Sequence, residues 1–320
     1  MINVDLSVCI VNWNAIKYLP ISLDSIMACS TGINYEIIIH DNASSDGSVA
    51  LLESDYPMVR VLANNNNVGF AAGNNIASKA ANGRYILYLN PDTELRTNAF
   101  EGMVRFMDQN PEYGAIGCKL ENGDGTIQYT CARTFPTPFN QFCYLAMINR
   151  LFPRSKLLSS VELEYWDHNN SRDIDCISGA CLLVRKEVND CIGGFDENIF
   201  MYGEDVDICY RIRDLGYKIY YLATERIVHY GGKSSGQIQL NHFSTILQRF
   251  SNYYFLKKTY GIVRATNYRI AVGIGSLIRI ILVSIYNTGK ILKGKQPESF
   301  IFHKYKALFH WSLFLSRPKV

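Results

Sequence analysis

The chain has 320 residues, of which 48% are hydrophobic, and a formal net charge of +3; this composition is ample for the core of one large domain, or of one domain with an appendage. Its nine cysteines form no C-x-x-C pair and are odd in number, which argues against a disulfide scaffold and favours buried free thiols in a reducing cytosol. Basic residues are concentrated in residues 241–320, where Glu298 is the only acid, so the remaining body is acidic and unsuited to nucleic acid.

Residues 1–120 alternate short apolar runs with helical patterns. The runs predict strands at Leu6–Val11, Glu36–His40, Val59–Leu62 and Tyr85–Leu89. The segments between them predict helices near 15–28, 45–54 and 71–81. This rhythm predicts an α/β fold with a mostly parallel sheet and helices on both faces. In such sheets, ligands bind beyond the carboxyl ends of the strands.

A polar segment follows each of these four strands. The segments are Asn12-Trp13-Asn14, Asp41 to Gly47, Asn64 to Phe70 and Asn90 to Glu94. Turn chemistry explains some of the Asn, Asp and Gly residues, but it does not require an acid or an amide after every strand. We therefore expect the four strand ends to form one ligand-binding rim.

The next part of the chain is less regular. Asn122 to Gly125 predicts a hairpin turn, and the prolines that follow predict a loop region with short helices over 135–172, a candidate lid on the acceptor side. A strand is expected at Ile174–Val184, where Gly179 and Ala180 would permit close approach of a ligand. A helix at about 203–215 and a strand at Tyr217–Leu222 follow. The run from Ile227 to Gly232 is expected to close the body.

Three carboxylates lie close together in Gly203-Glu204-Asp205-Val206-Asp207. A helix that begins at Gly203 would place Glu204 and Asp205 in its first turn, where the helix dipole favours acids. A carboxylate at the edge of a pocket can also act as a general base. An acidic helix cap is the alternative interpretation.

Asp92 follows an apolar strand, and His229 ends another. A carboxylate at a strand end suits a hard divalent cation that bridges phosphates, although Asp92 could equally cap a helix beginning near Thr93. His229 would be a second metal ligand if it reached the same rim; otherwise it is structural.

Asp41 and Trp13 are candidates for binding a nucleotide base. The Asp41 carboxylate could accept a hydrogen bond from the imide N–H of uracil or thymine, and Trp13 could stack on the ring. The alternatives are an Asx turn for Asp41 and ordinary packing for Trp13.

Six segments occur in an order that resembles glycosyltransferase family 2, and more narrowly its bacterial rhamnosyltransferase-like branch. They are Val8 to Asn14, Asp41 to Gly47, Asn67 to Phe70 with Gly73-Asn74, Leu89 to Asp92, Gly193 to Glu197, and Gly203 to Asp207. The resemblance covers about residues 5–235. Each motif alone is weak, whereas the ordered set is specific.

The resemblance implies a GT-A fold and an inverting transfer from a nucleoside diphosphate sugar. It assigns donor binding to Asn12, Trp13, Asn14, Asp41, Asn67, Gly69, Asn74, Asn90 and Asp92. It assigns a Mg²⁺ or Mn²⁺ site to Asp92 and His229, and the base to Asp205 beside Glu204. The acceptor side would include Gly179, Ala180, Asp196, Glu197 and Asp207. Asn90 replaces the first Asp of the family's D-x-D motif, which leaves Asp92 as the main carboxylate.

We expect a catalytic domain over residues 1–239, with a donor half at about 1–120 and an acceptor half at about 121–239. Residues 240–320 would form a basic, apolar helical region, either peripheral on an anionic membrane at its cytoplasmic face or packed on the body. The apolar window Ile270–Tyr286 is interrupted by Gly, Ser and Arg279, which argues against a membrane span. The N-terminus predicts a strand rather than a signal peptide.

The predicted function is transfer of a sugar, with L-rhamnose from dTDP-rhamnose the best candidate, to a glycan or lipid-linked acceptor of a cell-surface polysaccharide. A family 2 enzyme using UDP-GlcNAc, UDP-galactose or UDP-galactofuranose, and a non-catalytic nucleotide-sugar binder, are the alternatives. A sugar-phosphate nucleotidyltransferase is disfavoured, because Asn12-Trp13-Asn14-Ala15 follows the first strand instead of a Gly-rich, basic phosphate loop.

Overall fold

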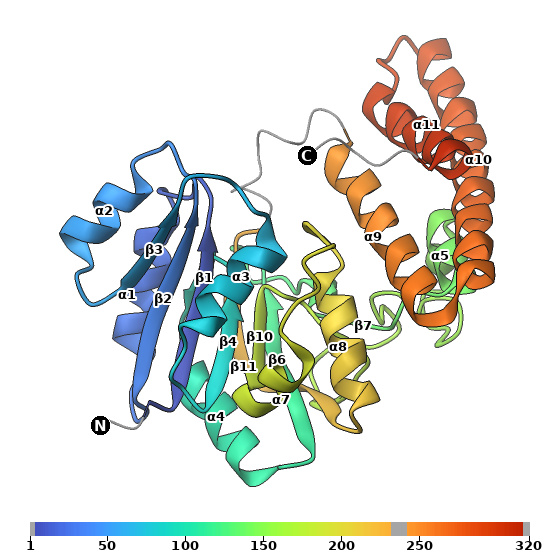
Figure 1. Cartoon of the computed structure of the whole chain (residues 1–320). Helices are drawn as coiled ribbons and strands as arrows, with labels where there is room; N and C mark the ends of the chain where they lie inside the picture. The colour runs from blue at the N-terminus through green and yellow to red at the C-terminus, as the bar shows by residue number, and fades with distance from the viewer. Residues whose placement is uncertain (1–3, 232–241, 316–320) are drawn as a thin grey trace. The chain divides into compact units, whose positions relative to one another are not determined.

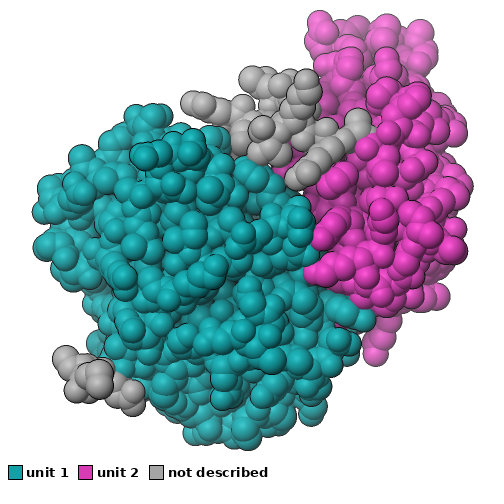
Figure 2. All heavy atoms as spheres, in the orientation of Figure 1, with its two compact units in different colours: residues 1–133, 167–236 teal, residues 134–166, 237–320 magenta. Residues whose placement is uncertain are grey.

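The computed structural model describes residues 4–231 and 242–315, and the chain divides into two compact units (Figure 2). The first unit comprises residues 1–133 and 167–236, and the second comprises residues 134–166 and 237–320. Residues 134–166 therefore group with the C-terminal helices and not with the body in which the sequence analysis places them. Gly232, the last residue of the run expected to close the body, lies outside the described residues.

A mixed sheet forms the core of the first unit (Figure 1). Within the described residues its strands are β1 (Leu6–Asn12), β2 (Tyr35–Asn42), β3 (Arg60–Asn64), β4 (Tyr85–Leu89), β5 (Thr93–Leu95), β6 (Tyr113–Glu121), β8 (Arg172–Asp173), β10 (Cys181–Arg185) and β11 (Lys218–His229). The order is β3-β2-β1-β4-β10-β6-β11-β5, with β8 paired to β11.

The N-terminal half of this sheet is parallel. β1 pairs in parallel with both β2 and β4, and β2 pairs in parallel with β3. β10 is antiparallel to its neighbours β4 and β6, whereas β6 and β11 are parallel. Every residue of β1 and β4 is buried, which explains why their sequences are mostly apolar. Because β1, β2 and β4 run in the same direction, the loops that follow these three strands leave the same edge of the sheet.

Helices flank the sheet, as the alternating sequence pattern predicts. They are α1 (Leu19–Cys29), α2 (Ser48–Asp55), α3 (Phe70–Lys79), α4 (Ala99–Gln109), α7 (Lys186–Ile192) and α8 (Glu204–Asp214), with a 3₁₀ turn η1 (Tyr129–Cys131). A small antiparallel pair, β7 (Ala132–Arg133) with β9 (Cys176–Ile177), adjoins this core. The predicted α/β class and the predicted hairpin are confirmed, since Glu121 and Ile127 form a bridge across the turn.

Two strand predictions are wrong in detail. The strand expected at Ile174–Val184 is broken into β9 and β10 at Ser178, where the backbone turns and Cys181 N donates to Ser178 O (3.2 Å). The two strands expected at Tyr217–Leu222 and from Ile227 onward are one strand, β11, whose register shifts between Leu222 and Arg226. In both places the backbone adjusts to pairing partners that are distant in sequence.

The second unit is helical. It contains α5 (Pro138–Leu145), α6 (Ile148–Leu151), α9 (Phe243–Tyr260), α10 (Ile262–Leu292) and α11 (Ser299–Phe314). The glycines of the apolar window do not interrupt α10, because they lie where neighbouring helices approach closely. A Cβ on Gly275 would lie 2.7 Å from Leu145 Cβ, and one on Gly273 would lie 2.7 Å from Ser312 Oγ.

The opposite face of α10 is apolar and exposed. Ile270, Ile274, Leu277, Ile281 and Ile285 are between 43% and 65% exposed and follow a helical spacing of three or four residues. The view that this window is too short and interrupted for a membrane span is therefore wrong about its continuity. By length and composition alone, this 31-residue helix could cross a membrane, and 28% of its most apolar window is buried within the protein.

Candidate active site

Asn90, Asp92 and His229 lie together at the edge of the sheet in the first unit. The sheet places them there, because β5 and β11 pair with His229 opposite Thr93. His229 Nε2 lies 3.3 Å from Asp92 Oδ1 and 3.1 Å from Asn90 Nδ2. Asp92 is 2% exposed. Both of its carboxylate oxygens, and Asn90 Oδ1, lack a hydrogen-bond partner among the described residues.

Buried oxygens without partners are costly unless a ligand satisfies them. Carboxylate and amide oxygens with one imidazole nitrogen form a donor set that suits Mg²⁺ or Mn²⁺. No group of three or more His, Cys, Asp or Glu side chains arranged to hold a metal is found in the described parts of the chain. A cation held here would therefore need phosphate oxygens or water to complete its coordination.

The hairpin after β6 supports this cluster through Gln128. Gln128 Oε1 lies 2.9 Å from His229 Nδ1, and Gln128 Nε2 donates to the backbone oxygen of His229 (2.5 Å). Gln128 Nε2 also donates to Asn122 Oδ1 (2.8 Å), in the turn of the hairpin. Both nitrogens of the His229 ring are thus in contact with polar side chains.

The backbone between β9 and β10 joins this cluster to the acidic pair of α8. Asn90 N donates to Ala180 O (3.1 Å) on one side. Gly179 N donates to Asp205 Oδ2 (3.2 Å) on the other. A Cβ on Gly179 would lie 3.6–3.7 Å from Phe70, Asp205 and Glu204, so the loop passes close to the acids. The structure therefore brings together the residues predicted for the metal, the base and part of the acceptor side.

Glu204 and Asp205 occupy the first turn of α8, as the sequence predicts. Gly203 precedes them with a φ of 116°, a left-handed conformation that glycine adopts readily. Asp205 Oδ2 is ion-paired with Arg133 Nη2, whereas Asp205 Oδ1 and Glu204 Oε2 are buried without a hydrogen-bond partner among the described residues. Burial, together with the neighbouring Asp205 carboxylate, raises the pKa of Glu204 to about 8.

The segment after β1 is held by a hydrogen-bonded turn. Asn12 Nδ2 donates to Asp41 Oδ1 (2.7 Å), and Ser44 N donates to Asp41 Oδ2 (2.9 Å). Asp41 is 1% exposed and forms the Asx-type turn considered as its alternative role. Asn14 is exposed, and its Oδ1 accepts from Ser45 N (2.8 Å). Trp13 is half-buried between Asn12 and Asn14.

The loop before α3 is shaped by Gly69. Its φ of 90° is left-handed, and a Cβ there would lie 2.6 Å from the Phe200 ring, so no larger residue fits without a shift. Asn67 Oδ1 accepts from Gly69 N (2.9 Å). Asn74 is fully buried in α3, and its Nδ2 donates to Phe70 O (3.0 Å). These residues hold the segment that begins α3.

The residues assigned to the acceptor side around Gly194 make structural contacts. Asn75 of α3 donates to Glu197 Oε1 (3.0 Å), and Asp196 Oδ1 accepts from Asn198 N (3.0 Å). Asp207, which is 1% exposed, accepts from Arg211 Nε (2.7 Å) one helical turn later.

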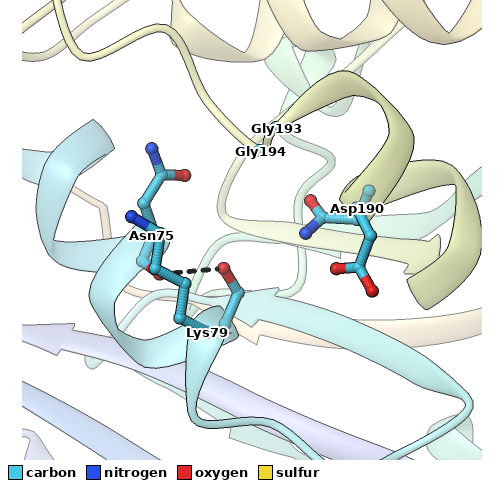
Figure 3. Close-up of a pocket in the computed structure, with 7 residues that line it drawn as sticks. Asn75, Lys79, Asp190, Gly193 and Gly194 are labelled. Carbon is cyan, nitrogen blue, oxygen red and sulfur yellow. Dashed lines mark hydrogen bonds between the residues drawn. The ribbon is translucent and has the colours of Figure 1, made fainter.

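A cavity of about 230 Å³ opens between α3 and the end of α7 (Figure 3). Its lining residues are Asn75, Ser78, Lys79, Asn189, Asp190, Gly193 and Gly194.

Gln128 and Arg133 are absent from the sequence-based prediction. Gln128 lies on the return side of the hairpin and Arg133 lies on β7, and a single Gln and a single Arg have no periodic pattern or family motif to distinguish them. Only the pairing of distant segments places them against His229 and Asp205.

The glycosyl transferase family 2 model matches residues 7–193, which is more than half of the chain. The chain belongs to glycosyl transferase family 2. Its match covers the sheet edge with Asn12, Asp41 and Asp92, and ends just before the acidic pair.

Curated relatives of this family 2 glycosyltransferase include rhamnosyltransferases. The N-acetylglucosaminyl-diphospho-decaprenol L-rhamnosyltransferase of Mycobacterium tuberculosis is 27% identical over 231 residues, which cover 69% of this chain and 74% of the relative. The O-antigen biosynthesis protein RfbC of Myxococcus xanthus is 28% identical over 66% of this chain and 16% of its own length. Rhamnosyltransferase WbbL of Escherichia coli is 25% identical over 51% of this chain and 61% of its own length.

Solved structures confirm the GT-A fold of the family 2 chain. The mannosyltransferase PcManGT of Pyrobaculum calidifontis, in complex with GDP-Man and Mn²⁺, superposes with a TM-score of 0.59 at 14% identity and covers 98% of this chain and 86% of its own. GalNAc-T7 with UDP, GalNAc and Mn²⁺ gives a TM-score of 0.58 at 14% identity, covering 99% of this chain and 58% of its own.

Proposed function

We propose that the protein is an inverting glycosyltransferase that moves a sugar from a nucleoside diphosphate donor to a glycan or lipid-linked acceptor in cell-surface polysaccharide biosynthesis. The observation that carries the proposal is the backbone connection, in a family 2 chain, between the Asp92 cluster and the Asp205 carboxylate. The first suits a leaving diphosphate, and the second suits an attacking hydroxyl.

For the donor we favour dTDP-L-rhamnose. The support is similarity to relatives named as rhamnosyltransferases, one of which aligns over 69% of this chain. Trp13 is the residue we assign to stacking on the base. Asp41 is nearly inaccessible and accepts two protein hydrogen bonds, so we assign it to holding the loop that carries Trp13. UDP-GlcNAc, UDP-galactose and UDP-galactofuranose are the alternative donors.

Asp92, Asn90 and His229 would hold a divalent cation. The support is the buried side-chain oxygens of Asp92 and Asn90, which have no hydrogen-bond partner among the described residues, and the position of His229 Nε2 beside Asp92. Two proteins of the same fold were solved with Mn²⁺. When bound, Mg²⁺ or Mn²⁺ supplies positive charge that offsets the charge developing on the leaving diphosphate.

Asp205 is the residue we assign as the base. Its Oδ2 is held by Arg133 and Gly179, which leaves Oδ1 to accept a proton from the acceptor hydroxyl. Glu204 is a poor candidate, because a carboxyl group with a pKa of about 8 is mostly protonated at neutral pH.

The transfer is a single displacement. The acceptor oxygen forms a bond to the anomeric carbon while its proton passes to Asp205. The bond from that carbon to the diphosphate breaks, and its electron pair remains on the diphosphate oxygen. One displacement inverts the anomeric configuration and needs no enzyme nucleophile. A glycosidase would instead need a second carboxyl group that protonates a glycosidic oxygen.

For the second unit we propose peripheral contact with an anionic membrane at its cytoplasmic face. The support is the exposed apolar face of α10 and the excess of basic residues in 241–320. Apolar side chains would enter the interface, while Lys and Arg would contact anionic headgroups. Such contact would suit a lipid-linked acceptor.

The test is a donor screen by thermal shift, with and without Mn²⁺, on the wild type and on Asp92→Asn. We expect one nucleotide sugar to raise the melting temperature of the wild type only with Mn²⁺, because a ligand that binds the native state stabilises it. Asp92→Asn should lose most of that shift. If a UDP-sugar stabilises the protein and dTDP-rhamnose does not, that UDP-sugar is the donor in place of dTDP-rhamnose. Donor binding without transfer to any acceptor would favour the non-catalytic alternative.

A further inference from the structure

The His229 ring contacts polar groups through both nitrogens, and heavy-atom positions alone do not say which nitrogen carries the hydrogen. Nδ1 faces Gln128 Oε1 at 2.9 Å, while Nε2 faces Asn90 and Asp92. An amide oxygen can only accept. The orientation of the Gln128 amide therefore decides whether Nδ1 of the ring carries a hydrogen.

The surrounding hydrogen bonds fix that orientation. Gln128 Nε2 lies 2.5 Å from the backbone oxygen of His229, which can only accept, so the amide nitrogen must point there. The Gln128 oxygen consequently faces His229 Nδ1.

The hairpin turn gives the same direction independently. Thr126 Oγ1 donates to the Asp124 carboxylate (2.6 Å), so this hydroxyl must accept from Asn122 Nδ2 (2.8 Å). The oxygen of the Asn122 amide is then left to accept from Gln128 Nε2 (2.8 Å). The Thr126 side chain and backbone hold the pKa of Asp124 below its ordinary value, which keeps the carboxylate an acceptor. The donors point in one direction from His229 to Asp124.

We infer that Gln128 is a positioning residue that holds neutral His229 in its Nδ1–H tautomer and presents the Nε2 lone pair toward Asp92. A histidine ligates a metal through its unprotonated nitrogen, and the partner of the other nitrogen sets which one that is. The tautomer follows from this chain's hydrogen bonds alone. Its use in cation binding rests on the proposed function.

Asn90 has a matching place in this arrangement. Its Nδ2 lies 3.1 Å from His229 Nε2 and can donate to the lone pair that the Gln128 contact leaves there. An aspartate at this position would offer only acceptors to that lone pair. The departure from the D-x-D motif is thus compatible with the Nδ1–H tautomer.

The first readout is a long-range ¹H–¹⁵N correlation spectrum of protein labelled with ¹⁵N-histidine, recorded near pH 8 without metal or donor. His229→Asn identifies the His229 signals by their loss. We expect the Nδ1–H pattern in the wild type and its loss in Gln128→Met, which has no acceptor. Gln128→Glu keeps an acceptor and should retain the pattern. Thr126→Val perturbs the same hairpin but leaves Gln128 bound to the His229 carbonyl, so it should retain the pattern too.

The second readout is Mn²⁺ affinity, measured by electron paramagnetic resonance of free Mn²⁺. We expect Gln128→Met to bind about 10–100-fold more weakly than the wild type, and Thr126→Val to bind as the wild type does. An Nε2–H pattern in the wild type, or an unchanged pattern in folded Gln128→Met, overturns the tautomer assignment. Equal Mn²⁺ affinity of the wild type and Gln128→Met overturns the positioning role of Gln128. An Nδ1–H pattern in a wild type that binds no Mn²⁺ instead contradicts the metal site of the proposed function.

Discussion

The guanidinium of Arg133 is ion-paired with the carboxylate of Asp205, and the two side chains are only 15% and 10% exposed. Arg133 lies on β7 and Asp205 in the first turn of α8, so segments 72 residues apart meet in this pair. A charge-assisted hydrogen bond in such surroundings is stronger than a neutral one. Removing one partner leaves the other charge buried and uncompensated.

We predict that Arg133→Gln lowers kcat by about 10–100-fold, because Asp205 loses the charged group that holds its carboxylate. Truncating one member of a buried charge pair costs about 2 kcal/mol or more, which corresponds to a rate change of this size. The affinity for the donor should change little. Arg133→Lys retains the charge and should recover part of the loss. Steady-state kinetics with varied donor separate kcat from KM.

The matched control for that variant is Arg213→Gln, which removes an exposed arginine paired with Asp175. Exposed pairs contribute about 0–1 kcal/mol, so this variant should keep nearly the wild-type kcat. A kcat for Arg133→Gln equal to that of Arg213→Gln would contradict the positioning of Asp205 by Arg133.

The base assignment predicts a separation between binding and chemistry. Asp205→Asn should reduce transfer by at least about 10²-fold, because the amide cannot take the acceptor proton. Donor binding, measured by calorimetry, should remain near wild type, since the donor is assigned to other residues. If Asp205→Asn loses donor binding together with transfer, Asp205 is not the base.

Glu204 predicts a pH dependence of stability. Its pKa is raised in the folded protein from 4.5 to about 8, so the folded state holds a proton that the unfolded state releases within this range. Stability is therefore greatest below the lower value and is lost as the pH rises through the upper one. Glu204→Gln removes the titrating carboxyl group, so stability should depend less on pH in this variant.

The measurement is the urea midpoint of unfolding at several values between about pH 5 and pH 9. The urea midpoint of the wild type should fall over this pH range more than that of Glu204→Gln. Glu187→Gln, which alters an exposed acid at the start of α7, should follow the wild type. Parallel curves for the wild type and Glu204→Gln would show that Glu204 titrates normally.

The fold was largely predictable because, in the first half of the chain, the residue pattern within each segment identifies it as a strand or a helix. β1 and β4 are buried apolar runs, each followed by a polar turn, and hydrophobic pattern alone separates them from the helices. The break at Ser178 and the continuous β11 were not predictable, since both depend on pairing between distant strands. The grouping of 134–166 with the C-terminal helices also depends on tertiary packing.

The candidate site was predictable where a residue ends or follows a strand, or lies in the first turn of a helix. Asp92, His229 and Asp205 meet this condition, and the structure connects them through hydrogen bonds and short contacts. Gln128 and Arg133 do not, because the role of Gln128 arises when the hairpin packs against His229, and that of Arg133 when β7 pairs with β9. Asp41 shows another limit: the sequence left a base contact and an Asx turn open, and only the structure shows that Ser44 N and the Asn12 side chain occupy its two oxygens.

The exposed face of α10 predicts membrane binding that can be tested without removing the second unit. Deleting residues 241–320 would strip α5 of its packing, since Gly275 of α10 abuts Leu145. A double variant, Ile274→Glu with Ile281→Glu, alters two half-exposed side chains instead. Glu is a good helix former, so the folded stability should change little.

We expect the double variant to bind vesicles containing anionic lipid at least about tenfold more weakly, because each buried isoleucine contributes about 1.5–3 kcal/mol and the new carboxylates are repelled. Sedimentation with vesicles measures the bound fraction. Met58→Glu changes a residue that is 62% exposed in the first unit and should bind as the wild type does. Added salt should weaken binding of the wild type, because basic residues contribute to it. If the double variant sediments as Met58→Glu does, α10 does not dock on the membrane and its apolar face has another partner.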